Sequence, residues 1–415
     1  MMDMFLPAPV KAALSRLEAA GHDAFVVGGC VRDQVLGVTP HDYDICTSAV
    51  PQEMQRVFAG ERTIETGIRH GTLTVLLSGM PLEITTFRVD GEYLDGRHPA
   101  SVRFARQVEE DLSRRDFTVN AMAYSPRAGL VDPFGGRQDC RAGLIRCVGK
   151  AEERFREDAL RILRALRFSA RLGFPIERDT DRALRAGKEQ LKKISQERIA
   201  AELTGLLQGK EAERVLKAYP DVIVTVLPEL GALTQSGQWH ASLRAVRFSP
   251  LDPVNRWAAF LQHCGTEEGN SPALAETVLK SLKMSAKMTD GAVQLISWKD
   301  AALKPDTLQE LLVRVGPDAA EKLIRLRAAN RLSQGEREET VRQDTQRLLE
   351  QLSSLLARNA CFTLAQLAVN GRDMAAAGLK GPAIGQALNG LLLRVARGEL
   401  PNEKEALLSA VRAGF

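Results

Sequence analysis

The chain has 415 residues, of which 44% are hydrophobic and 26% are charged, and its formal net charge is +4. This length favours two to four domains, and the composition is typical of a soluble globular protein. The small net charge does not by itself indicate a nucleic-acid binder, and the sequence predicts neither a membrane span nor a signal peptide.

Helix and strand signals alternate over residues 1–147, which predicts a mixed α/β unit. Two adjacent glycines, Gly28 and Gly29, stand where a short apolar strand passes into a helix. Two β-rich runs on either side of residues 78–81 predict a hairpin. The expected elements are helices over 8–20 and 31–36, strands over 24–27, 42–46, 72–77 and 82–87, and a polar, mobile loop over 88–102.

Strand signals nearly vanish after Gly149, and helical periodicity dominates to the end of the chain. The expected fold class is therefore α+β, with a small mixed α/β head followed by a long all-helical region. The six cysteines include no C-x-x-C pair, and neither they nor the six histidines form a zinc pattern. This cysteine usage predicts a reduced, cytoplasmic setting.

Asp42 and Asp44 occupy alternate positions of the expected strand over 42–46, so their side chains should project to one face. Two unpaired carboxylates side by side are unfavourable unless a cation neutralises them. Oxygen ligands with room for water and phosphate suit Mg²⁺, and Glu83 on the hairpin alternates correctly to supply a third acid. The alternative for these residues is a solvent-facing strand edge that carries two acids.

The glycine turn supports a functional role for this acid pair. A strand that enters Gly28 and Gly29 and leaves into a helix lets backbone N–H groups approach a phosphate. Arg32, in the first turn of that helix, is placed to pair with the same phosphates. A Gly-Gly pair alone is compatible with an ordinary turn, but the turn, the helix and the acids together indicate a triphosphate site.

Arginines recur at helical spacing along residues 153–174. Apolar residues gather on one side of the predicted helix, and Arg161, Arg164, Arg167 and Arg171 gather on another. Arginine offers planar, bidentate recognition that lysine lacks, and no lysine lies on that face. The alternative is a solvated basic face with a local ion pair. Two residues do not fit this division, Leu160 and Phe168.

Asp158 and Arg161 match the hydrogen-bonding edges of two bases. Cytosine and adenine each present an amino donor beside a ring-nitrogen acceptor, so a carboxylate can accept from the first and a guanidinium donate to the second. Guanine and uracil reverse this order and leave buried groups unpaired, at a cost of about 1–3 kcal/mol per group. This pair would therefore select C and A without a nucleic-acid template.

Six motifs follow one another over residues 25–174, namely GGCVRDQVLG, DYDICTSA, LEITTFR, DGEYLDGRHPASVRF, RRDFTVNAMAY and REDALRILRALRFSARLGF. In this order they resemble the class II nucleotidyltransferase family and, within it, the bacterial CCA-adding tRNA nucleotidyltransferases. A second segment, GLKGPAIGQALNGLLLRVARGELPNEKEALL at 378–408, resembles the tail of homodimeric relatives.

The resemblance implies a seahorse-like arrangement of four regions, with a homodimer as the assembly and no membrane association. The implied regions are a nucleotidyltransferase head over 1–147, a helical neck over 148–209 that recognises the nucleotide base, a helical body over 210–345, and a helical tail over 346–415 that binds tRNA.

The resemblance also implies a reaction. The 3′-hydroxyl of tRNA attacks the α-phosphorus of CTP or ATP and pyrophosphate leaves, with two Mg²⁺ ions as cofactors. Asp42 and Asp44 would be the metal ligands and Glu83 the third catalytic acid. The implied nucleotide-binding residues are Gly29, Arg32, Arg115, Asp116, Asp158, Arg161, Arg164 and Arg167, and the implied RNA contacts are Lys380 and Gly381.

Other functions stay open at this point. An A-adding tRNA nucleotidyltransferase or a bacterial poly(A) polymerase would keep the same head, although the intact loop over 88–102 argues against a CC-only enzyme. An RNA-binding protein with a lapsed site would not need Asp42, Asp44 and all the arginines. A metal-dependent phosphohydrolase would need histidines near the acids, and His70 and His98 lie too far in the sequence from the acidic cluster of Asp42 and Asp44 to support this function.

Overall fold

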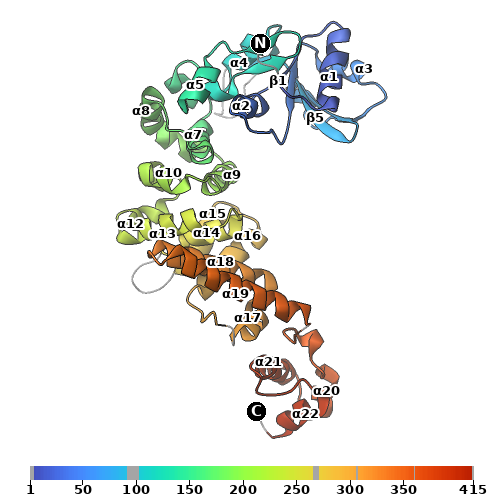
Figure 1. The fold of residues 1–415 in the computed structure, drawn as a ribbon, viewed down its shortest axis with the longest axis vertical. Coiled ribbons are helices and arrows are strands. Elements are labelled where there is room, and N and C mark those ends of the chain that lie inside the picture. Colours follow the sequence, from blue (N-terminus) through green and yellow to red (C-terminus); the bar gives the residue numbers. More distant parts are fainter. Residues whose placement is uncertain (1–3, 91–101, 265–270, 305–306, 359, 414–415) are drawn as a thin grey trace. The chain divides into compact units, whose positions relative to one another are not determined.

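The structure is a computed structural model that describes residues 4–90, 102–264, 271–304, 307–358 and 360–413. The chain divides into two compact units, whose elements are labelled in Figure 1. Unit 1 comprises Met1–Glu211 with Asp221–Val226, and unit 2 comprises Ala212–Pro220 with Leu227–Phe415.

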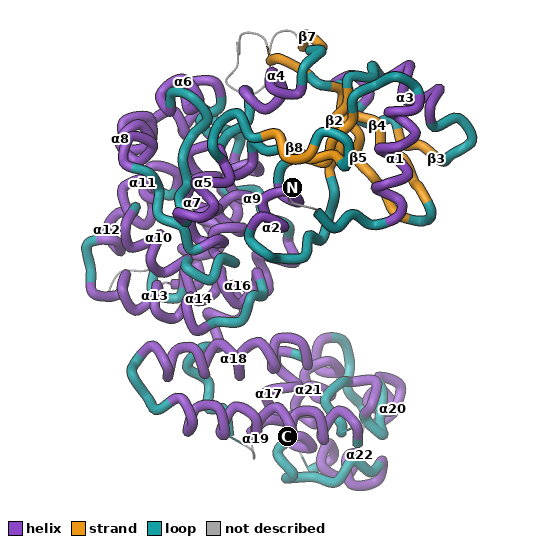
Figure 2. The backbone as a smooth tube through the Cα atoms, turned by 45° about the horizontal axis from the view of Figure 1, so that its top comes forward, coloured by secondary structure: helices purple, strands orange, loops and turns teal. Residues whose placement is uncertain are grey.

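A seven-stranded sheet forms the centre of unit 1, and Figure 2 shows the strands of the described chain gathered there. Its strands are β1 (Ala24–Val27), β2 (Asp44–Thr47), β3 (Arg62–Ile64), β4 (Thr72–Leu77), β5 (Met80–Thr86), β8 (Ala123–Ser125) and β9 (Gly129–Val131). They are ordered β3-β4-β5-β2-β1-β8-β9. β2 runs parallel to β5, whereas β1 pairs antiparallel with β2 and with β8.

Alternating apolar residues anchor this sheet, as the sequence predicts. In β4, Leu73, Val75 and Leu77 are buried, whereas the residues between them are partly exposed. Each buried aliphatic side chain contributes roughly 1.5–3 kcal/mol. The helices of unit 1 are α1 (Ala8–Ala19), α2 (Gly29–Val35), α3 (Pro51–Val57), α4 (Val108–Ser113), α5 (Gly136–Ala142), α6 (Ala151–Glu157), α7 (Leu160–Leu172), α8 (Arg178–Gly187), α9 (Gln196–Leu207) and α11 (Pro220–Val226).

Two predictions for unit 1 are wrong in part. The ends of the predicted loop over 88–102 form an antiparallel pair, β6 (Arg88–Asp90) with β7 (Val102–Phe104), and its middle lies outside the described residues. The predicted helix over 153–174 is interrupted at Asp158, whose backbone is extended at φ −143° and ψ 103°. Oδ1 of Asp158 accepts the N–H of Leu160 at 3.0 Å, and this side-chain acceptor satisfies a donor at the start of α7.

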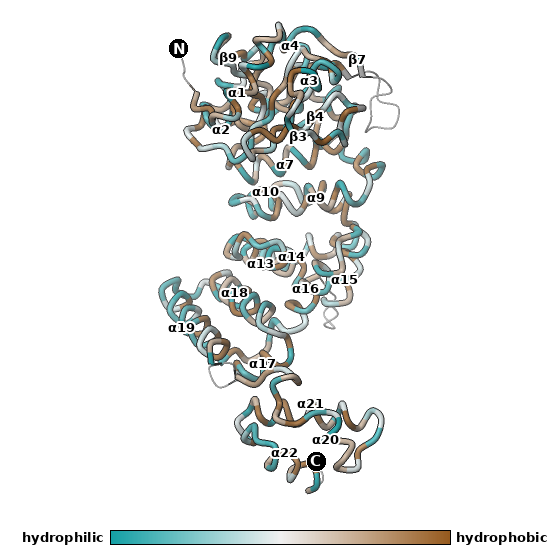
Figure 3. The backbone as a smooth tube through the Cα atoms, turned by 90° about the vertical axis from the view of Figure 1, so that its right-hand side faces the viewer, coloured by the Kyte–Doolittle hydropathy of each residue, from teal (hydrophilic) through white to brown (hydrophobic). Residues whose placement is uncertain are grey.

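Unit 2 is helical in its described residues, as predicted for the region after Gly149. Its tail has a core of its own, in which Met374, Leu391 and Leu407 are fully buried. The helices are α10 (Ala212–Ala218), α12 (Gly231–Thr234), α13 (Gly237–Phe248), α14 (Pro253–Leu261), α15 (Ser271–Ser281), α16 (Ala286–Trp298), α17 (Leu308–Val315), α18 (Pro317–Ser333), α19 (Glu338–Ala357), α20 (Gly371–Ala376), α21 (Pro382–Ala396) and α22 (Lys404–Arg412). Figure 3 shows many hydrophilic residues along α19. Within the described parts of the chain, no helix is long and apolar enough to cross a membrane.

A carboxylate on α17 joins this helix to the C-terminal end of α21. Oε1 of Glu310 accepts from Arg314 at 2.9 Å and from Arg397 at 2.8 Å, and its Oε2 accepts from Nε of Arg397 at 2.9 Å. The hydrogen bonds from Arg397, together with those from Arg314, lower the pKa of Glu310 to about 2. Arg397 follows the last residue of α21, so this cluster fixes that helix against α17.

Acid should therefore loosen the tail. Because the pKa of Glu310 is lower in the folded chain than in the unfolded chain, its contribution to stability is present above the ordinary value of 4.5 and is lost as the pH falls toward 2. We expect amides of α21 to exchange faster in Glu310→Gln than in the wild type at about pH 5, with a smaller difference at about pH 3. Glu321→Gln, in an exposed pair within α18, is the control. An equal difference at both pH values would contradict this role.

Candidate active site

The three predicted acids lie at one end of the central strands, next to the glycine turn. The register places Asp44 beside Glu83 of β5 and beside Val27, the last residue before the turn. Asp42 lies two residues ahead of β2, so the prediction that one strand carries both acids is wrong, although the charge of Asp42 still acts on Asp44. Strand pairing therefore brings a carboxylate from each of β2 and β5 to the turn at Gly28.

The negative charge of Asp44 is poorly compensated. Protein atoms displace water around its carboxyl group, and Asp42 and Glu83 add like charge, so the pKa of Asp44 is raised despite the opposing charge of Arg115. Among the described residues, no group of three or more His, Cys, Asp or Glu side chains is arranged to hold a metal ion. The acids nevertheless fit a divalent cation of the Mg²⁺ type, which prefers carboxylate oxygens and keeps water or phosphate as its other ligands.

Two guanidinium groups stand at the glycine turn. Gly28 has φ +79°, and a Cβ at this position would lie 3.2 Å from Nη1 of Arg115. Arg32 is 3% exposed and donates to Oδ1 of Asn120 at 2.6 Å and to Oδ1 of Asp33 at 2.6 Å. Both arginines are therefore held beside the turn, which is the placement that a triphosphate site requires.

A buried acid that the sequence reasoning missed holds Arg115. Asp111 is 1% exposed and pairs with Arg115 at 3.1 Å and with Arg114 at 2.7 Å. Its Oδ1 also accepts the backbone N–H of Arg88 at 3.3 Å. Burial opposes ionisation of Asp111, but the two arginines outweigh it and lower its pKa. The signal that could have revealed Asp111 is its spacing of three and four residues ahead of the arginines.

Two acids neutralise much of the predicted arginine face. Asp116 accepts from Nε of Arg164 at 2.8 Å. Glu202 of α9 accepts from Nε of Arg167 at 2.6 Å and lies 3.5 Å from Arg164. Burial opposes ionisation of Asp116, but Arg164 outweighs it and lowers the pKa of this carboxyl. Arg164 and Arg167 therefore belong to an ordered ion-pair array, whereas Arg171 is exposed, as the alternative of a solvated basic face expects.

The predicted base-reading pair is also held in place. Oδ2 of Asp158 accepts from Arg198 of α9 at 2.7 Å. Arg161 is 8% exposed and donates to Oε2 of Glu157 at 2.7 Å and to the carbonyl of Arg114 at 2.9 Å. Both side chains are thus fixed at the junction of α6 and α7. Sequence reasoning missed Glu157, although it stands four residues before Arg161.

The two predicted RNA contacts lie elsewhere, in the turn between α20 and α21 of unit 2. Lys380 is exposed, and Gly378 and Gly381 have φ of +95° and +56°, a conformation that favours glycine. The structure therefore confirms a turn between two helices here. It places these residues in a different unit from the acids and arginines.

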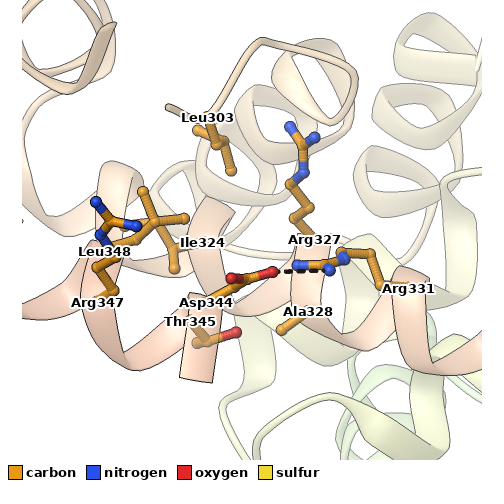
Figure 4. Close-up of a pocket in the computed structure, with 9 residues that line it drawn as sticks. All are labelled: Leu303, Ile324, Arg327, Ala328, Arg331, Asp344, Thr345, Arg347 and Leu348. Atoms are coloured by element: carbon orange, nitrogen blue, oxygen red, sulfur yellow. Dashed lines mark ion pairs between the residues drawn. The ribbon is translucent and has the colours of Figure 1, made fainter. Parts of the chain in front are cut away.

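A pocket of about 300 Å³ in unit 2 offers a different chemistry (Figure 4). Arg331 pairs there with Asp344 at 2.9 Å, and Arg327 donates to the carbonyl of Ala301 at 2.9 Å. The pocket is lined by Leu303, Ile324, Arg327, Ala328, Arg331, Asp344, Thr345, Arg347 and Leu348. A single carboxylate, already paired, does not offer the clustered acids of the sheet edge.

Three family models match the chain in succession. The Poly A polymerase head domain matches residues 24–146, the probable RNA and SrmB-binding site of polymerase A matches residues 173–221, and the putative tRNA nucleotidyltransferase domain 2 matches residues 252–411. The first of these covers the sheet, the glycine turn and the acids.

Several relatives match this chain over nearly its whole length. A CCA-adding enzyme of Limosilactobacillus fermentum is 36% identical over 403 residues, covering 97% of this chain and 96% of the relative. A CCA-adding enzyme of Geobacillus stearothermophilus is 36% identical over 399 residues, covering 95% and 94%. The crystal structure of a Bacillus stearothermophilus CCA-adding enzyme in complex with CTP has a TM-score of 0.81 and 33% identity, covering 98% of each chain. A Thermotoga maritima CCA-adding enzyme complexed with tRNA, at 24% identity and a TM-score of 0.57, shares the fold.

Proposed function

Because this chain belongs to the family of CCA-adding enzymes, we propose that it adds C, C and A in turn to the 3′ end of tRNA. It uses CTP and ATP, needs no nucleic-acid template and releases pyrophosphate. The similarity to CCA-adding enzymes over nearly the whole chain is the observation that carries this function. A cytoplasmic location and a homodimer complete the proposal.

We propose that Asp42 and Asp44 hold two Mg²⁺ ions, with Glu83 beside them as a third acid. Bound there, the ions would activate the 3′-hydroxyl of the RNA and neutralise charge on the triphosphate. The support is the strand register that sets Asp44 beside Glu83, together with the raised pKa of Asp44, which burial causes first and the like charges of Asp42 and Glu83 second. In this proposal Asp42 and Asp44 are the metal ligands, and Glu83 is the third catalytic acid.

The glycine turn and its arginines would bind the triphosphate. Gly29 is the first residue of α2, where backbone N–H groups lack an intrahelical acceptor, and Arg32 and Arg115 bring positive charge to the turn. These three groups would orient the α-phosphorus toward the acids, because charge-assisted hydrogen bonds from guanidinium groups fix phosphate oxygens.

The neck would read the base. The carboxylate of Asp158 would accept from the amino group of C or A through a lone pair that its hydrogen bonds from Leu160 and Arg198 leave available, and Arg161 would donate to the ring nitrogen beside it. Asp116 and Glu202 keep Arg164 and Arg167 oriented toward the same nucleotide. We propose the four-part division into a head over 1–147, a neck over 148–209, a body over 210–345 and a tail over 346–415 on the same grounds.

The decisive experiment uses a tRNA transcript that lacks its terminal CCA. With CTP alone we expect two added nucleotides, with ATP alone none, and with both three, each read as a discrete band on a sequencing gel. An A-adding enzyme would instead extend only a transcript that already ends in CC, and a poly(A) polymerase would make long tails from ATP alone. An RNA-binding protein with a lapsed site would transfer no label.

The turn at Lys380 and Gly381 is proposed to contact tRNA phosphates. Such a contact is independent of sequence and weakens with salt, because binding releases counterions. We expect Lys380→Ala to weaken binding of different tRNAs to the same extent and to reduce the slope of log affinity against log salt by about one charge. Filter binding over a salt series measures this, with the exposed Lys304→Ala as the control. An unchanged slope would count against the contact.

A further inference from the structure

Phe168 is an apolar residue on the arginine side of α7. Its ring is 6% exposed. The guanidinium carbons of Arg32, Arg164 and Arg167 lie 5.7, 5.4 and 4.5 Å from its centroid. Three cations around one phenyl ring are more than packing of the helix requires, since a leucine would fill most of the same space.

The three arginines belong to two different parts of the site. Arg32 comes from α2 at the glycine turn, whereas Arg164 and Arg167 come from α7. Each has its own acid partner, since Arg32 pairs with Asp33 at 2.6 Å and the other two pair with Asp116 and Glu202. The ring of Phe168 is therefore where the phosphate side and the base side of the site meet.

A phenyl ring can organise these groups in a way that an aliphatic side chain cannot. Its faces carry partial negative charge, so guanidinium groups over them are attracted and their mutual repulsion is reduced. The ring itself is fixed by an edge contact with Phe117, at 5.8 Å between centroids and 78° between planes. It thus presents a rigid electrostatic surface to all three arginines.

We propose that Phe168 is a positioning residue of the nucleotide site, which keeps Arg32 in line with Arg164 and Arg167 before the nucleotide arrives. This inference rests on the proposed function, because it takes these arginines as ligands of CTP and ATP. Loss of the partial negative charge on the ring faces should then weaken nucleotide binding, because the nucleotide itself would have to order the three arginines. The chemical step should change little, because the acids are not touched.

The test reduces the partial negative charge on the ring faces while the shape of the side chain stays nearly constant. Phenylalanine at 168 is replaced by its mono-, di- and trifluoro analogues through suppression of a stop codon, which progressively removes the negative charge of the ring faces. We expect KM for CTP and ATP to rise stepwise, by about threefold to tenfold for the trifluoro analogue, while kcat and Tm stay close to the wild type. The same analogues at Phe155, a buried residue of α6 with no arginine over its ring in the described residues, are the matched control.

The outcomes separate the two proposals. Phe168→Leu would also lose the edge contact with Phe117, so the fluorinated series carries the test and Phe168→Tyr serves as the rescue. A flat KM across the series, with the wild type active, overturns the positioning role alone. If the wild type transfers no nucleotide, the proposed function fails, and calorimetric binding of CTP to the same variants still decides whether the ring orders the arginines.

Discussion

Replacing Asp44 with asparagine is expected to lower the rate of both C and A addition by at least about a thousandfold. The substitution preserves the size of the side chain but removes its charge from the acids of β2 and β5. Asp42→Asn should have the same effect, because both carboxylates act on one site although only Asp44 belongs to the strand. Incorporation of labelled CTP and ATP into tRNA lacking its 3′ end measures the loss.

The control for these variants is Asp23→Asn. Asp23 is exposed and precedes β1, and the register of β1 with β2 places it at the far end of the strand from Asp44. Asp23→Asn removes the same charge from the same head, so normal activity of this variant would show that the loss in Asp44→Asn depends on where the carboxylate lies. Near-normal turnover of Asp44→Asn would instead refute the assignment of the acids, and tRNA binding should be unchanged in all three variants.

Magnesium provides an independent readout of the same site. A ligand that binds only the folded protein raises its Tm, and the shift grows with ligand concentration. Mg²⁺ in the presence of CTP should therefore raise the Tm of the wild type, and Asp44→Asn should lose most of this shift. The stability of the variant without Mg²⁺ should equal or exceed that of the wild type, because the substitution removes like-charge repulsion with Asp42 and Glu83.

Local sequence patterns predicted the parts of the site that lie close together in the chain. The glycine turn is such a case, because Gly28 has φ +79°, a conformation that residues with a side chain rarely adopt. Strands β1, β2, β4 and β5 of the sheet were also predicted, whereas the three-residue strands β3, β8 and β9 were not. The parallel pairing of β2 with β5, which brings Glu83 beside Asp44, is consistent with the predicted third acid.

The partners of the arginines were not predictable in this way. Glu202 and Arg198 come from α9, 35 and 40 residues from Arg167 and Asp158, and no periodicity within α7 points to them. The helical wheel also placed Arg161 on the polar side, yet it is buried, because Glu157 and a backbone carbonyl satisfy its donors. Burial of a charged group depends on such distant acceptors, which a wheel does not include.

Asp158→Ala is expected to lower kcat/KM for CTP and ATP by about a hundredfold and that for UTP and GTP much less, so that selection of C and A is relaxed. The reason is that UTP and GTP are rejected mainly because they lack the amino group at the matching position and leave the carboxylate of Asp158 without its hydrogen bond. Alanine has no carboxylate, so this penalty disappears. Competition between labelled CTP and UTP on one tRNA substrate measures the ratio. Glu153→Ala, an exposed acid on the preceding helix, should leave it unchanged.

Asp158→Asn separates base recognition from the role of Asp158 at the start of α7 better than alanine does. Asp158 also begins α7 by accepting the N–H of Leu160, so alanine removes a helix cap together with the base contact. Asp158→Asn can keep that cap through its amide oxygen and turn its NH₂ group toward the base, where it would donate to the carbonyl of uracil. If Asp158 reads the base, asparagine should therefore favour UTP more than alanine does, although both lose the ion pair with Arg198. A loss of activity that is equal for all four nucleotides in both variants would mean that Asp158 serves the helix junction and that another group selects the base.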